Sequence, residues 1–224
     1  MGIHDGHRER MKKRFAEGRL SGFDDINALE MLLFYALPRQ DTNALAHRLI
    51  DRFGSLARVL SADMAELESV DGIGENAAML ICLVTQINKR YLESRSIEKQ
   101  RITSIADAGE YFIAKFAYET CEISYALLLN NSGGIIACRE IGRGVVNAAN
   151  IRVRRLVELA IEHKAASVIV AHNHPDGETQ PSVEDELSTS SMRSALGLVG
   201  VKLIDHIIVS GDRFFSFADM HILY

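Results

Sequence analysis

The chain has 224 residues, of which 47% are hydrophobic and 25% are charged, as is ordinary for a soluble globular protein of one large or two small domains. It carries 30 acidic against 25 basic residues, a net charge of −5, and neither half is basic, which excludes a broad nucleic-acid-binding surface. The three cysteines form no CxxC pair, which argues against a disulfide framework. No apolar run approaches about 18 residues and the start of the sequence has no signal-peptide core, so we expect a cytoplasmic protein without membrane contacts.

The first part of the chain is predicted to be helical. Apolar residues recur at intervals of three and four over residues 25–37, 42–53 and 75–91, the spacing of amphipathic helices. The polar stretch LESRSIEKQR that follows is interpreted as a linker. We therefore predict a helical domain over residues 1–91, a linker over 92–101 and a second domain over 102–224.

Two glycines, Gly72 and Gly74, lie between helical segments in ELESVDGIGENAAMLICLV. This pattern resembles a helix-hairpin-helix motif, whose glycines allow a tight turn and whose exposed backbone N–H groups can hold a DNA phosphate without reading bases. Glu75 and Asn76 follow, where DNA-binding examples often have a lysine or arginine. Two interpretations stand: weak, non-specific DNA binding at Gly72 and Gly74, or a turn that only packs two helices.

The second part of the chain mixes strands and helices. Strand-like apolar runs and two further helical segments follow one another, and a Gly211-Asp212 turn joins the last two strands. The expected strands cover residues 122–131, 134–141, 165–171, 202–211 and 213–217, and the expected helices cover residues 107–118 and 151–165. The fold class is therefore predicted as α/β (α+β), with a small all-helical domain before a mixed-sheet domain.

The stretch HNHPDGETQPSVED, residues 172–185, contains the candidate metal-binding side chains. It follows the apolar segment AASVIVA, which is predicted to be a buried strand, so His172 and His174 point to the same side at the strand end. With Asp185 they make three of the four ligands of a tetrahedral zinc ion, and the fourth position stays open for water. Ser182 and Asp185 also fit a capping box at a helix start.

Other metal motifs that contain paired histidines do not fit these letters. Gly177 stands where a metallo-β-lactamase pattern needs its next histidine, and the chain has neither the PCxxC of zinc deaminases nor an HExxH helix. His206, in the apolar run LIDHIIV, is interpreted as a strand residue, with Asp205 as a neighbour that could connect it to the site.

The pattern HxH, seven residues, then SxxD resembles the JAMM/MPN-type metalloproteases, and the chain resembles the bacterial RadC family over nearly its whole length. The resemblance implies a layered α/β domain of the cytidine-deaminase type. It implies that His172, His174 and Asp185 bind zinc, and that Ser182 hydrogen-bonds the metal-bound water or the oxyanion. It further implies a general-base glutamate on a strand beside the metal, for which Glu140 is the best match.

Two functions are expected from these features. The first is a zinc-dependent hydrolase that cleaves a peptide or isopeptide bond in a protein or peptide substrate, since that is the chemistry of the JAMM family. The alternative is a DNA-binding repair or recombination accessory factor that uses the helix-hairpin-helix domain, a role with which the RadC family is associated. The sequence does not identify the substrate.

Overall fold

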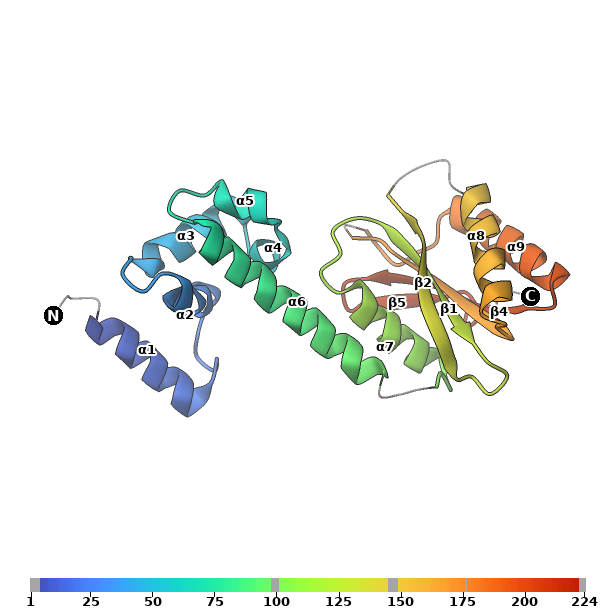
Figure 1. The fold of residues 1–224 in the computed structure, drawn as a ribbon, viewed down its shortest axis with the longest axis horizontal. Helices are drawn as coiled ribbons and strands as arrows, with labels where there is room; N and C mark the ends of the chain where they lie inside the picture. The colour runs from blue at the N-terminus through green and yellow to red at the C-terminus, as the bar shows by residue number, and fades with distance from the viewer. Residues whose placement is uncertain (1–4, 98–100, 145–148, 176, 222–224) are drawn as a thin grey trace. The chain divides into compact units, whose positions relative to one another are not determined.

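The computed structural model describes residues 5–97, 101–144, 149–175 and 177–221 (Figure 1). Its backbone divides into two compact units, Met1–Asn88 and Lys89–Tyr224. The first unit is helical and the second combines helices with one sheet, which confirms the predicted fold class. No helix among the described residues is long and apolar enough to cross a membrane.

The N-terminal unit is built from short helices that begin at capping residues. The side chains of Asp24, Asp41, Ser55 and Asp63 each accept a hydrogen bond from a backbone N–H in the first turn of the helix that follows, which satisfies an otherwise unpaired donor. The helices are α1 (Asp5–Gly18), α2 (Asp25–Ala36), α3 (Thr42–Phe53), α4 (Leu56–Ser61), α5 (Met64–Glu68) and α6 (Glu75–Ile97), whose residues after Asn88 belong to the second unit.

The last of these helices extends further than the sequence predicted. Helix α6 continues to Ile97, so residues 92–97 are helical although the polar sequence there predicted a linker. Leu, Glu, Arg and Ile are acceptable helix formers, and a helix that is already nucleated propagates through them at little cost. A polar composition alone therefore does not end a helix, and this stretch has no proline or glycine that would.

The C-terminal unit contains a five-stranded sheet in the order β2-β1-β3-β4-β5. Only β3 and β4 are parallel; the pairs β1/β2, β1/β3 and β4/β5 are antiparallel. The turn at Gly211-Asp212 joins β4 and β5, as predicted. The strands are β1 (Ile123–Leu129), β2 (Ile135–Arg143), β3 (Ser167–Asn173), β4 (Lys202–Ser210) and β5 (Arg213–Ser216).

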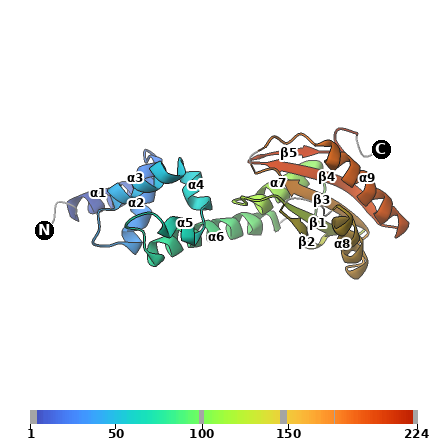
Figure 2. The same cartoon turned by 90° about the horizontal axis from the view of Figure 1, so that it is seen from above.

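Helices cover both faces of this sheet (Figures 1 and 2). Helix α7 (Ile105–Phe116) packs on one face, and helices α8 (Ala149–Glu162) and α9 (Val183–Leu198) pack on the other. The central strands β1 and β3 are buried along their whole length because apolar side chains face both helical layers. Alternation along a strand therefore decides which layer each side chain meets.

Candidate metal centre

The two histidines of the motif lie at the carboxyl end of β3. His172 is buried in the strand opposite Ser124 of β1 and Ile208 of β4. His174 lies one residue beyond the strand, and its backbone N–H donates to the carbonyl of Val209 at 2.8 Å. The β-strand alternation therefore places both imidazoles on one side of the sheet end, as the sequence predicted.

Asp185 reaches the same place from the first turn of α9. Its Oδ1 lies 3.3 Å from Nε2 of His172, and its Oδ2 lies 3.9 Å from Nε2 of His174. The two Nε2 atoms are 3.0 Å apart. One ligand atom from each of these three residues lies within 4.8 Å of the others, and among the described residues no other such group of metal-binding side chains occurs.

These donors suit a zinc ion. Tetrahedral zinc with imidazole and carboxylate ligands at about 2.0–2.2 Å separates neighbouring ligand atoms by roughly 3.3–3.5 Å, and the distances between these side chains fall near that value. Nδ1 of His174 lies 2.7 Å from the carbonyl oxygen of Glu178. Because a carbonyl only accepts, Nδ1 carries the proton and Nε2 presents its lone pair to the cluster.

Ser182 and Asp185 form the predicted capping box. The Ser182 hydroxyl accepts from the Asp185 N–H at 3.2 Å, while the N–H and hydroxyl of Ser182 donate to Oδ2 of Asp185 at 2.9 and 2.7 Å. Burial works to raise the pKa of Asp185, but the charge of His172 and the hydrogen bonds from Ser182 hold this pKa below its ordinary value. The carboxylate is therefore kept ionised, as a metal ligand must be.

The strand register places Glu140, the predicted general base, on the other face of the sheet from His172. Glu140 lies opposite Tyr125 of β1, whose side chain belongs to the core under α7. His172 lies opposite Ser124, the preceding residue, and so faces the other helical layer. The Glu140 carboxylate instead accepts hydrogen bonds from the guanidinium of Arg143 at 2.9 and 3.2 Å.

A buried chain of hydrogen bonds lies behind His172. Nδ1 of His172 is 2.8 Å from Nε2 of His206, and Nδ1 of His206 is 2.5 Å from Oγ1 of Thr189. The sequence suggested Asp205 as the connection from His206 to the site, but the Asp205 carboxylate accepts from Ser216, from Ala218 and from the backbone of His206. Thr189 carries no motif signal, although it lies four residues, one helical turn, after Asp185.

The glycine hairpin lies between α5 and α6, as a helix-hairpin-helix requires. Gly72 has a φ of +91°, which glycine adopts without strain, and Gly74 has open space around its Cα. A pocket of about 470 Å³ at this hairpin is lined by Glu68 and Glu75, among others. These two carboxylates would oppose a bound phosphate, whereas the guanidinium of Arg48 lies 3.2 Å from where a Cβ on Gly72 would stand.

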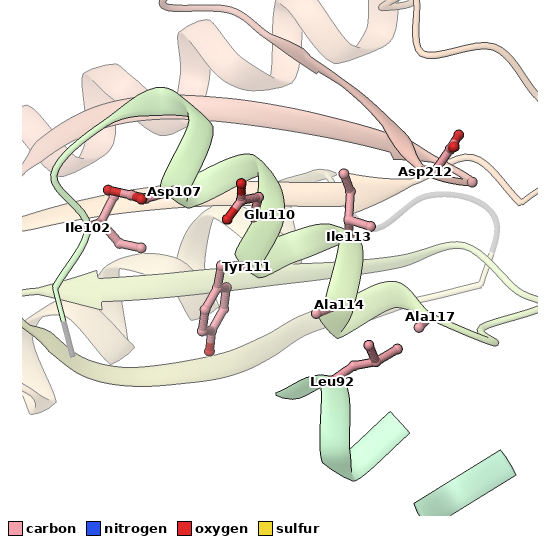
Figure 3. A pocket seen from close by; sticks show the side chains of 10 residues that line it. Leu92, Ile102, Asp107, Glu110, Tyr111, Ile113, Ala114, Ala117 and Asp212 are labelled. Atoms are coloured by element: carbon pink, nitrogen blue, oxygen red, sulfur yellow. The ribbon is translucent and has the colours of Figure 1, made fainter. Parts of the chain in front are cut away.

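A second pocket, of about 560 Å³, lies along α7 (Figure 3). Its walls are mostly apolar, and the carboxylates of Asp107, Glu110 and Asp212 lie around it. None of the three metal-binding candidates lines this pocket, and α7 covers the opposite face of the sheet from α9. The metal centre and this pocket are therefore separate features of the C-terminal unit.

The chain is similar to known proteins over nearly its whole length. Residues 102–222 match the family model described as the RadC-like JAB domain. A UPF0758 protein of Neisseria gonorrhoeae is 34% identical over 215 residues, and one of Fusobacterium nucleatum is 31% identical over 223 residues; each alignment covers 96% of this chain and 96% of the relative. A UPF0758 protein of Neisseria meningitidis is 33% identical over the same share of both chains. The chain therefore belongs to the RadC family.

Proposed function

We propose that this protein is a zinc-dependent hydrolase of the JAMM metalloprotease type, which cleaves a peptide or isopeptide bond. The observation that carries the proposal is the convergence of three donors, His172, His174 and Asp185, from a strand end and a helix start. The match to a JAB domain model over residues 102–222 supports the same class of reaction.

In this proposal the three side chains hold the ion and leave its fourth position open to solvent. Zinc, when bound, supplies a Lewis acid that lowers the pKa of water to about 7. The buried imidazole of His172 anchors the site, whereas His174 and Asp185 are partly exposed and give a substrate access.

Ser182 has a defined task in this arrangement. Its hydroxyl donates to Oδ2 of Asp185, which leaves Oδ1 facing His172. The hydroxyl therefore orients the carboxylate, and its predicted role at an oxyanion requires it to turn away from Oδ2. We do not assign proton transfer to Glu140, because its side chain lies on the α7 face of the sheet.

The proposal is tested by metal content and then by cleavage. We expect about one zinc per wild-type chain by mass spectrometry, and loss of that zinc in His174→Ala and Asp185→Ala. His47→Ala, which removes an exposed imidazole from the helical unit, is the control and retains the zinc. Wild-type protein that neither contains nor takes up zinc would overturn the proposal.

The bond that is cleaved is identified with a complex substrate. A peptide library made from a proteome is incubated with the zinc-loaded protein, and new amino termini, together with lysine ε-amines freed from isopeptide bonds, are mapped by mass spectrometry. We expect new termini with the wild type and none with His174→Ala or Asp185→Ala. Cleavage of branched or single-stranded DNA by the wild type, with the peptides left intact, would support the alternative that the site acts on nucleic acid.

A further inference from the structure

The hydrogen bonds behind His172 form a directed chain. Nδ1 of His172 contacts Nε2 of His206, Nδ1 of His206 contacts Oγ1 of Thr189, and Oγ1 of Thr189 donates to the backbone carbonyl of Asp185 at 2.5 Å. All three side chains are buried, with 2–3% of their surface exposed. A chain in this position links strand β3 to strand β4 and then to helix α9.

When both imidazoles are neutral, the last contact fixes the direction of the protons in the chain. The Asp185 carbonyl can only accept, so the single hydroxyl proton of Thr189 points toward it. Oγ1 of Thr189 then accepts from Nδ1–H of His206, whose Nε2 is left as an acceptor. Nε2 of His206 therefore accepts from Nδ1–H of His172, and Nε2 of His172 carries a lone pair. This lone pair faces that of Nε2 of His174 at 3.0 Å, an arrangement that a bound cation stabilises.

We propose that His206 and Thr189 are positioning residues that hold His172 in the tautomer able to bind a metal through Nε2. With the opposite direction, His172 would carry its proton on Nε2, the atom 3.3 Å from Oδ1 of Asp185, and could not be a ligand. This inference rests on the proposed zinc site, but it concerns side chains outside the HxH and SxxD motif.

The surroundings of His206 hold its ring in the orientation that this chain of hydrogen bonds requires. Its ring stacks on Phe217, with the centroids 4.9 Å apart and the planes 16° from parallel. Thr189 bonds to the carbonyl of Asp185, whose carboxylate is the third donor, so the chain connects two of the three proposed ligands. A partner of this kind fixes both the proton and the ring orientation of a metal-binding histidine.

The first experiment reads the tautomers in the metal-free protein. Long-range ¹⁵N–¹H correlation spectra of the histidine rings at neutral pH distinguish Nδ1–H from Nε2–H. We expect His172 and His206 both to be protonated on Nδ1 in the wild type. A proton on Nε2 of His172 overturns the inference, whether or not the protein is a hydrolase.

The second experiment measures zinc affinity in matched variants. Thr189→Val keeps the branched shape but removes the hydroxyl, whereas Thr189→Ser retains it. We expect Thr189→Val to raise the zinc dissociation constant by about 10- to 100-fold, and Thr189→Ser to restore most of the affinity. Ser188→Ala is the control, because Ser188 donates to the same carbonyl of Asp185 at 3.0 Å and sits one residue before Thr189.

The outcomes separate this inference from the proposed function. Wild type that binds zinc, with Thr189→Val binding it equally tightly and folding normally by circular dichroism, overturns the inference and leaves the hydrolase proposal standing. Wild type that binds no zinc overturns the hydrolase proposal, and the tautomer spectrum still decides the direction of the chain. If Thr189→Val does not fold, His206→Phe, which keeps a ring stacked on Phe217, gives the same comparison.

Discussion

The N–H and hydroxyl of Ser182 both donate to Oδ2 of Asp185, which leaves Oδ1 of that carboxylate 3.3 Å from Nε2 of His172. The carboxylate of Asp185 therefore has two roles: Oδ2 completes the capping box of helix α9 with Ser182, and Oδ1 faces the imidazole of His172. The helix start and the candidate metal centre are thus built from the same atoms. A change that removes the cap is expected to disturb both.

Replacing Ser182 with alanine tests this double use. The loss of the cap is expected to lower the free energy of unfolding of the metal-free protein by about 1 kcal/mol, measured by urea denaturation followed by circular dichroism. Zinc affinity is expected to fall as well, because Asp185 loses the hydroxyl that orients it. Ser104→Ala removes the N-cap of α7 and is expected to cost similar stability while zinc affinity stays unchanged. Equal zinc affinity in both variants would show that the cap does not orient the ligand.

The pH dependence of stability is expected to report Asp185. The charge of His172 and the Ser182 hydrogen bonds outweigh burial and hold the pKa of this carboxyl below its ordinary value. A carboxyl whose pKa is lowered by folding stabilises the fold above its unfolded pKa, about 4, and loses that contribution as the pH falls through the folded value. The stability difference between metal-free wild type and Asp185→Asn should therefore be largest above pH 4 and shrink on acidification. A difference that grows as the pH falls would contradict the assigned shift.

The metal-binding candidates could be predicted because their geometry is local. Side chains alternate along a strand, so His172 and His174 point to the same side. A capping box places Asp185 three residues after Ser182, in the first turn of the helix. Glu140 depends instead on how two strands pair. Glu140 pairs with Tyr125, whereas His172 pairs with the neighbouring Ser124, and a register different by one residue would place Glu140 on the face of His172. Spacing along the sequence carries no information on that register.

His206 was named from the sequence, but its contacts behind the site could not be predicted, for a related reason. Thr189 and His206 meet only because α9 packs on β4, and no pattern in either segment requires a partner in the other. The end of α6 could not be predicted for a different reason, since residues 92–97 extend a helix whose stability comes from its preceding turns. Strand order and the pairing of distant side chains are set by the packed fold rather than by local sequence.

Glu140→Gln is expected to leave the metal centre intact. The ion pair between Glu140 and Arg143 is largely exposed, so its loss should change the free energy of unfolding by less than about 1 kcal/mol. Zinc content should equal that of the wild type, as it should in Glu158→Gln, which breaks a comparable exposed pair with Arg154. If only Glu140→Gln abolished cleavage while zinc was retained, Glu140 would have to reach the site in the working enzyme.

Gly109→Ala is expected to destabilise the C-terminal unit. A Cβ at this position in α7 would lie 2.3–2.5 Å from ring atoms of Phe214, which no carbon atom tolerates without a shift. Overpacking of this kind costs about 1–3 kcal/mol, measured as a loss in the free energy of unfolding. Gly197→Ala, with open space around the glycine, is the matched helical control and should be neutral or slightly stabilising. Equal stability of the two variants would show that α7 moves freely on the sheet.

The two hairpin glycines are expected to respond differently to alanine, which provides a clean test of DNA binding. At Gly72 the φ of +91° and a Cβ placed 2.6 Å from Cδ2 of the buried Leu45 predict a loss of more than about 1 kcal/mol in stability, so Gly72→Ala cannot separate binding from folding. Gly74→Ala meets open space and should change the free energy of unfolding by less than about 0.5 kcal/mol.

Gly74→Ala is therefore the variant to use, because its methyl group would obstruct a phosphate at the hairpin without disturbing the fold. Since Glu68 and Glu75 line this pocket, we expect no retention of single-stranded or branched DNA in gel-shift assays even at low salt, and no difference between wild type and Gly74→Ala. Salt-dependent retention by the wild type that disappears in Gly74→Ala would reverse this conclusion. It would make the hairpin a phosphate site whose backbone N–H groups outweigh two neighbouring carboxylates.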